Sequence, residues 1–128
     1  MFQPKEITMS NHPIVHVEFA APDQEAAGKF YADLFGWKTQ YMPEFKYVTF
    51  ETGPDEVGGG INPVSESYPA GTVVFYVGTD DIEASLKKAE SLGAVTLMEK
   101  MEVPGMGWMG MFRDPAGNMI GLWKELPR

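Results

Sequence analysis

One alternating stretch carries the side chains best suited to chemistry. His16 and Glu18 stand two residues apart in "IVHVEFA", where they alternate with Val15, Val17 and Phe19. This period of two is typical of a β-strand with two different faces, so the imidazole and the carboxylate share one face. Such a pair can transfer protons, and one member can orient the other.

Both polar residues keep a second interpretation. His16 is either a pocket group, acting as hydrogen-bond donor, general base or metal ligand, or a satisfied polar residue in a half-buried strand. Glu18 is either its acid–base partner or a carboxylate at the solvated mouth of a cleft, because a buried carboxylate needs partners.

An internal repeat indicates how these residues are positioned. "IVHVEFAAPDQEAAGKFYADLFGW" is similar to "TVVFYVGTDDIEASLKKAESLGAV", with a strand, an acidic cap, a helix and a glycine in each. Asp23 and Asp81 fit N-caps, which accept a backbone N–H of the first helical turn. Gly36 and Gly93 fit the left-handed residue that ends a helix. We expect helices from Asp23 to about Leu34 and from Asp80 or Asp81 to about Leu92.

Three strand-like runs follow each predicted helix. They are residues 38–41, 45–51 and 57–61 in the first half, and residues 96–100, 108–112 and 119–123 in the second. Each half is therefore β-α-β-β-β, with turns at "GPDEV" and "DPAGN". The predicted fold class is α+β: one domain, residues 1–128, with modules of about 12–64 and 70–126 whose mixed sheets curve around a cleft.

The faces of the first strand of each module predict what lies inside. We expect the apolar faces to lie under the helices and the mixed faces to point into a cavity. The apolar faces are Val15, Val17 and Phe19 in the first module and Val73, Phe75 and Val77 in the second. The mixed faces are His16 and Glu18 in the first module and Val74 and Tyr76 in the second.

Composition narrows the function classes. The 128 residues carry a formal net charge of −8, which disfavours nucleic acid as a partner. The chain has no cysteine, so disulfides, thiolate metal sites and a cysteine nucleophile are excluded. No apolar run approaches the roughly 20 residues of a membrane span, and the first 13 residues do not read as a secretory signal. We expect a cytoplasmic protein that binds no membrane.

With "FYADLFGW" in the first helix and "FRDPAGNMIGLW" at the end, the paired modules resemble the vicinal oxygen chelate superfamily. That superfamily includes glyoxalase I, extradiol dioxygenases and bleomycin resistance proteins, and the resemblance runs from about His12 to Glu125. It implies a small-molecule ligand and a homodimer. It also implies that His16 lines the pocket.

The resemblance also implies where a metal would be held. Metal-using members place one ligand on the first and one on the last strand of each module. In this chain those positions are His16, Gly60, Val74 and Gly121. Only His16 has a side chain that binds metals, so we expect no metal of the family type and no cofactor.

The two glycines predict extra room at the cavity floor, because both positions lose a side chain. Met119 and Trp123 share the predicted cavity face with Gly121, as Tyr76 does with Val74. Tyr76 and Trp123 either line a pocket for a planar or apolar ligand or fill the space. Residues 101–112, rich in methionine, are either a lid over the cleft or an ordinary loop between strands.

Three functions fit these observations. The first is a metal-free binder whose ligand contacts are His16, Gly60, Val74, Tyr76, Met119, Gly121 and Trp123. The second is an enzyme of the superfamily, a lyase, isomerase or dioxygenase, with His16 and Glu18 as catalytic groups. The third is an interaction module without ligand chemistry. We favour the first, a binder of a small aromatic or apolar molecule.

Overall fold

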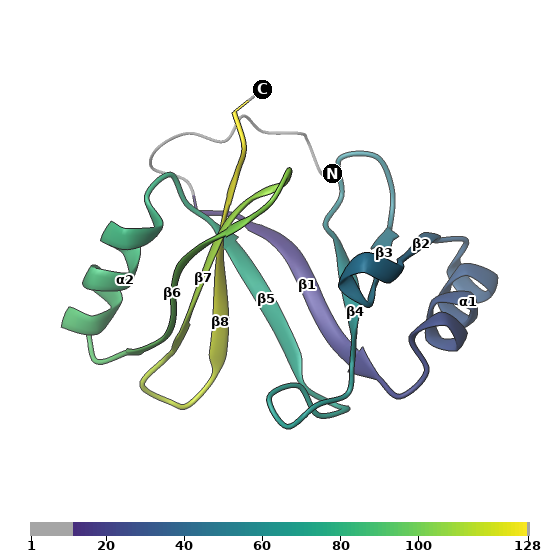
Figure 1. Cartoon of the computed structure of the whole chain (residues 1–128), viewed down its shortest axis with the longest axis horizontal. Coiled ribbons are helices and arrows are strands. Elements are labelled where there is room, and N and C mark those ends of the chain that lie inside the picture. The colour runs from purple at the N-terminus through teal and green to yellow at the C-terminus, as the bar shows by residue number, and fades with distance from the viewer. Residues whose placement is uncertain (1–11, 128) are drawn as a thin grey trace. The chain divides into compact units, whose positions relative to one another are not determined.

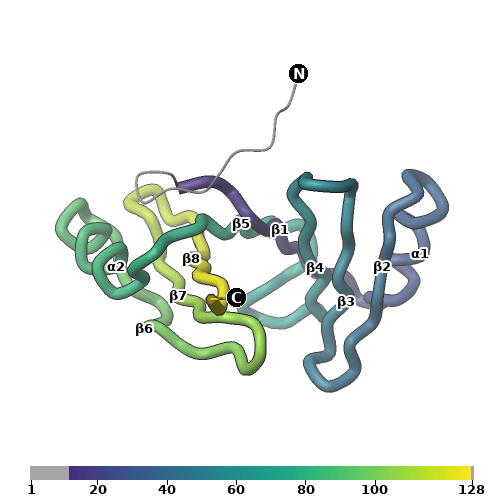
Figure 2. Tube along the Cα trace, turned by 90° about the horizontal axis from the view of Figure 1, so that it is seen from above, coloured from purple at the N-terminus to yellow at the C-terminus, as the bar shows by residue number. Residues whose placement is uncertain are grey.

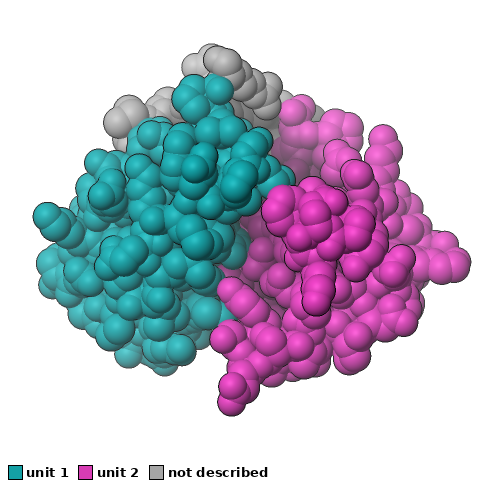
Figure 3. Space-filling model, viewed as in Figure 1, with its two compact units in different colours: residues 1–15, 75–128 teal, residues 16–74 magenta. Residues whose placement is uncertain are grey.

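A computed structural model describes residues 12–127, so most of the N-terminal stretch that does not read as a secretory signal lies outside the described residues. The chain divides into two compact units (Figure 3). One holds residues 16–74, and the other holds residues 75–127 together with residues 12–15. No helix in the described part is long and apolar enough to cross a membrane.

The first βαβββ set makes up most of the unit of residues 16–74. Its elements are β1 (Ile14–Ala21), α1 (Gln24–Phe35), β2 (Lys38–Met42), the short 3-10 helix η1 (Pro43–Phe45), β3 (Tyr47–Glu51) and β4 (Gly58–Pro63). The strand order is β2-β3-β4-β1. β1 pairs in parallel with β4, and the other neighbours are antiparallel. Figures 1 and 2 show α1 beside β2.

The second set repeats this plan. Its elements are β5 (Val73–Gly78), α2 (Ile82–Ser91), β6 (Val95–Val103), β7 (Gly107–Arg113) and β8 (Met119–Glu125). The order is β5-β8-β7-β6, with β5 parallel to β8 and two register shifts along β6. The repeated βαβββ order and the α+β class are therefore confirmed.

Local chemistry starts both helices and ends α1 as predicted, whereas α2 is capped by Leu92 and the left-handed Gly93 follows one residue later. The Asp23 side chain accepts a hydrogen bond from the backbone N–H of Ala26 at 3.0 Å, and Asp81 accepts one from Ala84 at 2.9 Å. Each bond satisfies a donor that the first helical turn leaves without a backbone partner. Gly36 ends α1 with a φ of 75°, in the left-handed region that glycine adopts without strain.

The prediction that the apolar face of each first strand lies under a helix is wrong for β5. Val73 is 63% exposed and Phe75 is 36% exposed, and only Val77 packs near α2. α2 packs mainly on β6, β7 and β8, where Ile82 and Leu86 form a core cluster with Leu122. The helix misses β5 because β5 lies at the far edge of this strand order from β6.

The helix of the first unit also packs mainly on the later strands of its module. α1 packs mainly on β2, β3 and β4. Phe19 of β1 does reach the core cluster of Val48, Phe50 and Ile61, as expected for the apolar face of β1. Each helix therefore covers the later strands of its module more than the first strand.

Most of the methionine-rich run of residues 101–112 belongs to two paired strands. It contains the end of β6, most of β7 and the tight turn between them. The backbone N–H of Met106 donates to the carbonyl of Val103 at 3.0 Å, and Gly105 has a φ of 76°. Of the two interpretations, the structure supports an ordinary hairpin.

Candidate functional site

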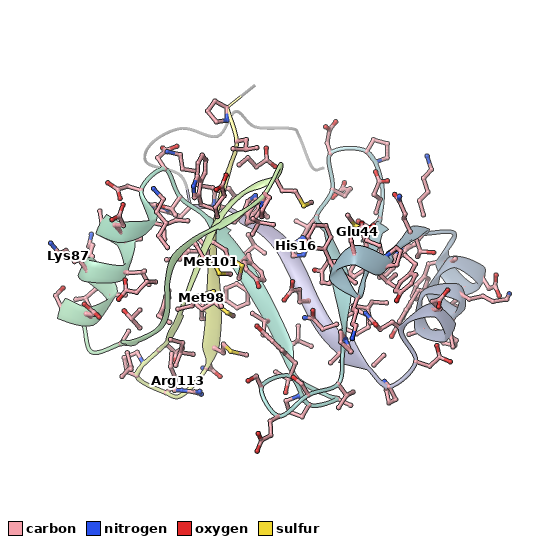
Figure 4. All side chains as sticks on the ribbon, viewed as in Figure 1. His16, Glu44, Lys87, Met98, Met101 and Arg113 are labelled. Carbon is pink, nitrogen blue, oxygen red and sulfur yellow. The ribbon has the colours of Figure 1, made fainter. Side chains whose placement is uncertain are left out.

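The unit of residues 16–74 joins His16 and Glu18 through a third side chain. Tyr47, the first residue of β3, places its hydroxyl 2.7 Å from His16 Nε2 and 2.6 Å from Glu18 Oε2. The imidazole and the carboxylate are themselves 3.7 Å apart. Figure 4 shows His16 on β1 beside β4. These three side chains are called the relay below.

Asn62 of β4 holds the other carboxylate oxygen. Its side-chain amide donates to Glu18 Oε1 at 3.2 Å, so both oxygens of this buried group accept hydrogen bonds. Burial alone raises the pKa of Glu18, but the charge and hydrogen bonds of its neighbours outweigh burial and lower the pKa below its ordinary value. His16 contributes most to this lowering, followed by Tyr47 and Asn62. Glu18 is therefore ionised at neutral pH.

The ionised carboxylate sets the direction of the other hydrogen bonds. A phenol has one proton, and Tyr47 donates it to Glu18. The Tyr47 oxygen must then accept from His16, so His16 Nε2 carries a hydrogen and neutral His16 has its lone pair on Nδ1. The side chain of His16 is 32% exposed, which makes it the accessible end of the relay.

Tyr47 stands where a side chain of residue 60 would begin. A Cβ added to Gly60 would overlap the Tyr47 ring at Cζ and the hydroxyl oxygen. The expectation of extra room at this glycine is therefore wrong, because the tyrosine ring fills the space. Thr49 faces Gly60 in the β3–β4 register. Tyr47 lies two residues before Thr49 on β3, which makes it the diagonal neighbour of Gly60.

In the second unit, too, a tyrosine ring packs against a glycine of a neighbouring strand. A Cβ added to Gly121 of β8 would overlap the ring of Tyr76, its register partner on β5. Tyr76 is buried, and its ring occupies the room expected beside Gly121. Tyr76 therefore fills space beside the glycine.

The predicted site residues fall into two groups. His16, Glu18 and Gly60 come together in the unit of residues 16–74, and Tyr47 and Asn62 join them. Leu122 marks the face of the β5–β8 sheet that packs on α2. The opposite face carries Tyr76, Met119, Gly121 and Trp123. Val74 of β5 is buried.

Sequence reasoning missed Tyr47, which completes the relay, and Asn62, which donates to the other oxygen of Glu18. Tyr47 alternates with the buried Val48 and Phe50, which marks its face, but nothing in that pattern names its partners. Tyr68 was also missed: it is half-buried, and burial together with the Glu18 charge raises its pKa. A backbone turn in which Tyr68 N–H donates to the Ser65 hydroxyl at 3.1 Å positions it.

The residues present do not fit a four-ligand metal centre of the family type. Val74 and the two glycines offer no donor, and tyrosine rings occupy the space beside Gly60 and Gly121. His16, the remaining position, directs Nε2 to the Tyr47 hydroxyl. Within the described residues, no group of three or more His, Cys, Asp or Glu side chains lies close enough to hold a metal ion.

A family model matches the fold and most of the chain. The model of the Glyoxalase/Bleomycin resistance protein/Dioxygenase superfamily matches residues 13–122. The chain therefore belongs to this superfamily.

Curated relatives support the same family. A glyoxylase-like domain-containing protein of Didymella fabae is 32% identical over 110 residues, which cover 80% of this chain and 85% of that protein. Anthracycline biosynthesis protein DnrV of Streptomyces peucetius is 29% identical over 124 residues, covering 84% of this chain but 45% of DnrV. This chain spans less than half the length of DnrV and of several other relatives it matches.

Solved structures share the fold. A superfamily member from Vibrio splendidus has a TM-score of 0.65 at 19% identity, covering 89% of this chain and 99% of that one. Methylmalonyl-CoA epimerase from Mycobacterium tuberculosis has a TM-score of 0.66 at 16% identity, covering 93% and 90%. At these identities, the likeness extends to the fold alone.

The contact between Tyr76 and Gly121 gives a testable prediction. Gly121→Ala is expected to destabilise the fold by about 1–3 kcal/mol, because the new methyl must displace a buried ring. Chemical denaturation measures this loss. Gly53→Ala is the control, since its Cβ would come no closer than 3.4 Å to Glu56. Equal stability of the two variants would contradict the Tyr76 packing.

Proposed function

We propose that the chain binds a small, aromatic or apolar organic molecule beside the relay, without a metal centre of the family type. The observation that carries the proposal is the hydrogen-bonded order His16–Tyr47–Glu18, which is partnered inside the unit and accessible at His16. A few oriented polar groups among apolar side chains are typical of small-molecule sites. The names of the relatives, among them an anthracycline biosynthesis protein, support an organic ligand.

The remaining residues expected to contact a ligand are proposed on sequence pattern and on the family resemblance alone. Gly60 and Val74 belong to the unit of residues 16–74, whereas Tyr76, Met119, Gly121 and Trp123 belong to the other unit. We also propose that the chain forms one domain, that it works as a homodimer and that it is cytoplasmic. Light scattering of the purified protein tests the dimer directly.

A screen of aromatic compounds by calorimetry tests the binding proposal. His16→Ala is expected to weaken binding about 5- to 12-fold, because a lost hydrogen bond to a polar ligand group is worth about 1–1.5 kcal/mol. Lys87→Ala is the matched control, since Lys87 projects outward from α2 (Figure 4).

Two results would contradict the binding proposal. One is that no compound binds the wild-type protein, and the other is that His16→Ala binds as tightly as wild type. Elemental analysis of untagged protein tests the metal part separately. One divalent ion per chain, lost in His16→Ala, would overturn it.

The relay also favours a second candidate, an enzyme that moves protons on a small molecule. A carboxylate that orients an imidazole through a hydroxyl supports a general base, which is the role first considered for His16 and Glu18. Proton exchange into a bound compound, followed by NMR in heavy water, separates the candidates. Exchange that His16→Ala abolishes supports an enzyme, whereas binding without exchange supports a binder.

A further inference from the structure

We propose that the relay selects ligands carrying a weakly acidic hydroxyl group, a phenol or an enol, whose proton His16 takes up while Tyr47 positions the imidazole. This inference rests on the proposed function and names the ligand class of the same site. Tyr47 is not one of the four positions at which the family places metal ligands, and the inference gives it the role of positioning the His16 ring.

The first step of the argument is steric. The Tyr47 ring occupies the space in which a side chain of residue 60 would start, so a glycine there is what admits the ring. From this place the hydroxyl reaches His16 Nε2 and Glu18 Oε2 at 2.7 and 2.6 Å. Tyr47 is therefore a positioning residue that acts on the ligand through His16.

The second step is the state of the imidazole. Because the phenol proton of Tyr47 goes to Glu18, His16 donates from Nε2, and the lone pair of the neutral ring lies on Nδ1. A ligand hydroxyl can donate to that lone pair. Transfer then breaks the ligand O–H bond and forms N–H on Nδ1, which leaves an imidazolium beside a ligand oxyanion, with no change in total charge.

The third step is electrostatic. The imidazolium formed by the transfer lies 3.7 Å from the Glu18 carboxylate, which stabilises it. The buried Glu18 charge and the formal net charge of −8 disfavour a ligand that arrives already ionised, such as a carboxylate. A neutral hydroxyl meets no such repulsion as it enters, and the oxyanion that the transfer forms is paired with the imidazolium.

The free protein offers the first test. The chain has two histidines, so the ¹⁵N signals of the His16 ring can be assigned by comparison with His16→Gln. We expect neutral His16 as the Nε2–H form, and a mixture of the two neutral forms in Tyr47→Phe. Tyr41→Phe, on exposed β2, is the control and should leave the signals unchanged. An Nδ1–H form in wild type, or unchanged signals in Tyr47→Phe, would overturn the proposal.

Chromophoric phenols test the ligand class. 4-Nitrophenol and 2-hydroxyanthraquinone absorb at longer wavelength when ionised, so absorbance reports proton transfer in the bound state. We expect the ionisation constant of at least one of them to rise tenfold or more on binding. Tyr47→Phe should lose most of this rise, and Tyr41→Phe should keep it.

The outcomes separate this inference from the proposed function. If the phenols bind without a change in ionisation, or if only aromatic compounds lacking a hydroxyl bind, the inference is wrong and the proposed function stands. If no aromatic compound binds, both are wrong.

Discussion

Gly59→Ala is expected to be the most damaging single-methyl change in the unit of residues 16–74, lowering the free energy of unfolding by about 3 kcal/mol or more. Gly59 pairs with Val17 in the parallel β1–β4 ladder. A Cβ at Gly59 would overlap the carbonyl oxygen of Val17, and a backbone atom cannot move aside without parting the strands. β1 carries His16 and Glu18, so the same change should also disrupt the relay.

Urea denaturation of Gly59→Ala beside Gly60→Ala measures this expectation. At Gly60 the overlap is with a side chain, so part of it can be relieved by movement of Tyr47. We therefore expect Gly60→Ala to be the milder change in stability while still breaking the Tyr47 hydrogen bonds. Gly59→Ala within about 0.5 kcal/mol of wild type would contradict the β1–β4 register.

Glu18→Gln is expected to lower stability at neutral pH by about 1–3 kcal/mol. The change removes the charge that accepts the Tyr47 and Asn62 hydrogen bonds and that lies 3.7 Å from the His16 ring. Folding lowers the pKa of Glu18, so its contribution is present above the ordinary pKa of 4.5. That contribution is lost as the pH falls through the lower pKa of the folded state. The difference in unfolding free energy between wild type and Glu18→Gln should therefore become smaller in acid.

Unfolding free energies at pH 7 and at about pH 3 measure the narrowing. Glu44→Gln is the matched control, because Glu44 lies exposed on η1 (Figure 4). A gap that stays constant between the two pH values, or a control that behaves like Glu18→Gln, would show that the carboxylate is not stabilised by its neighbours.

Local signals were enough to predict the two helices and the strands, but not the 3-10 helix η1, which contains Phe45 although a strand was expected there. Asp23, Asp81 and Gly36 work through hydrogen bonds and backbone angles within a few residues, so the sequence alone indicates them. The repeat then predicts the order of strands and helices, and the family resemblance predicts the fold.

The contents of the relay depend on contacts between distant residues. Tyr47 is 31 residues from His16 and 29 from Glu18, and no local period connects them. A glycine in a strand indicates a close approach, but the pattern does not say whether a ligand or an aromatic ring makes it. The wrong prediction that Val73 and Phe75 lie under a helix has a similar cause. The order of strands in the sheet decides which strands a helix covers, and a local pattern does not reveal that order.

The irregular strand β6 has a consequence for how the protein behaves at high concentration. β6 ends its strand order, so among residues 12–127 no strand of the unit pairs with one of its sides. The register shifts near Met98 and Met101, and the charges of Glu99 and Lys100 between them, make that side a poor template for a strand from another molecule. The unit can therefore carry a methionine-rich, apolar hairpin without offering neighbouring chains a straight edge on which to aggregate.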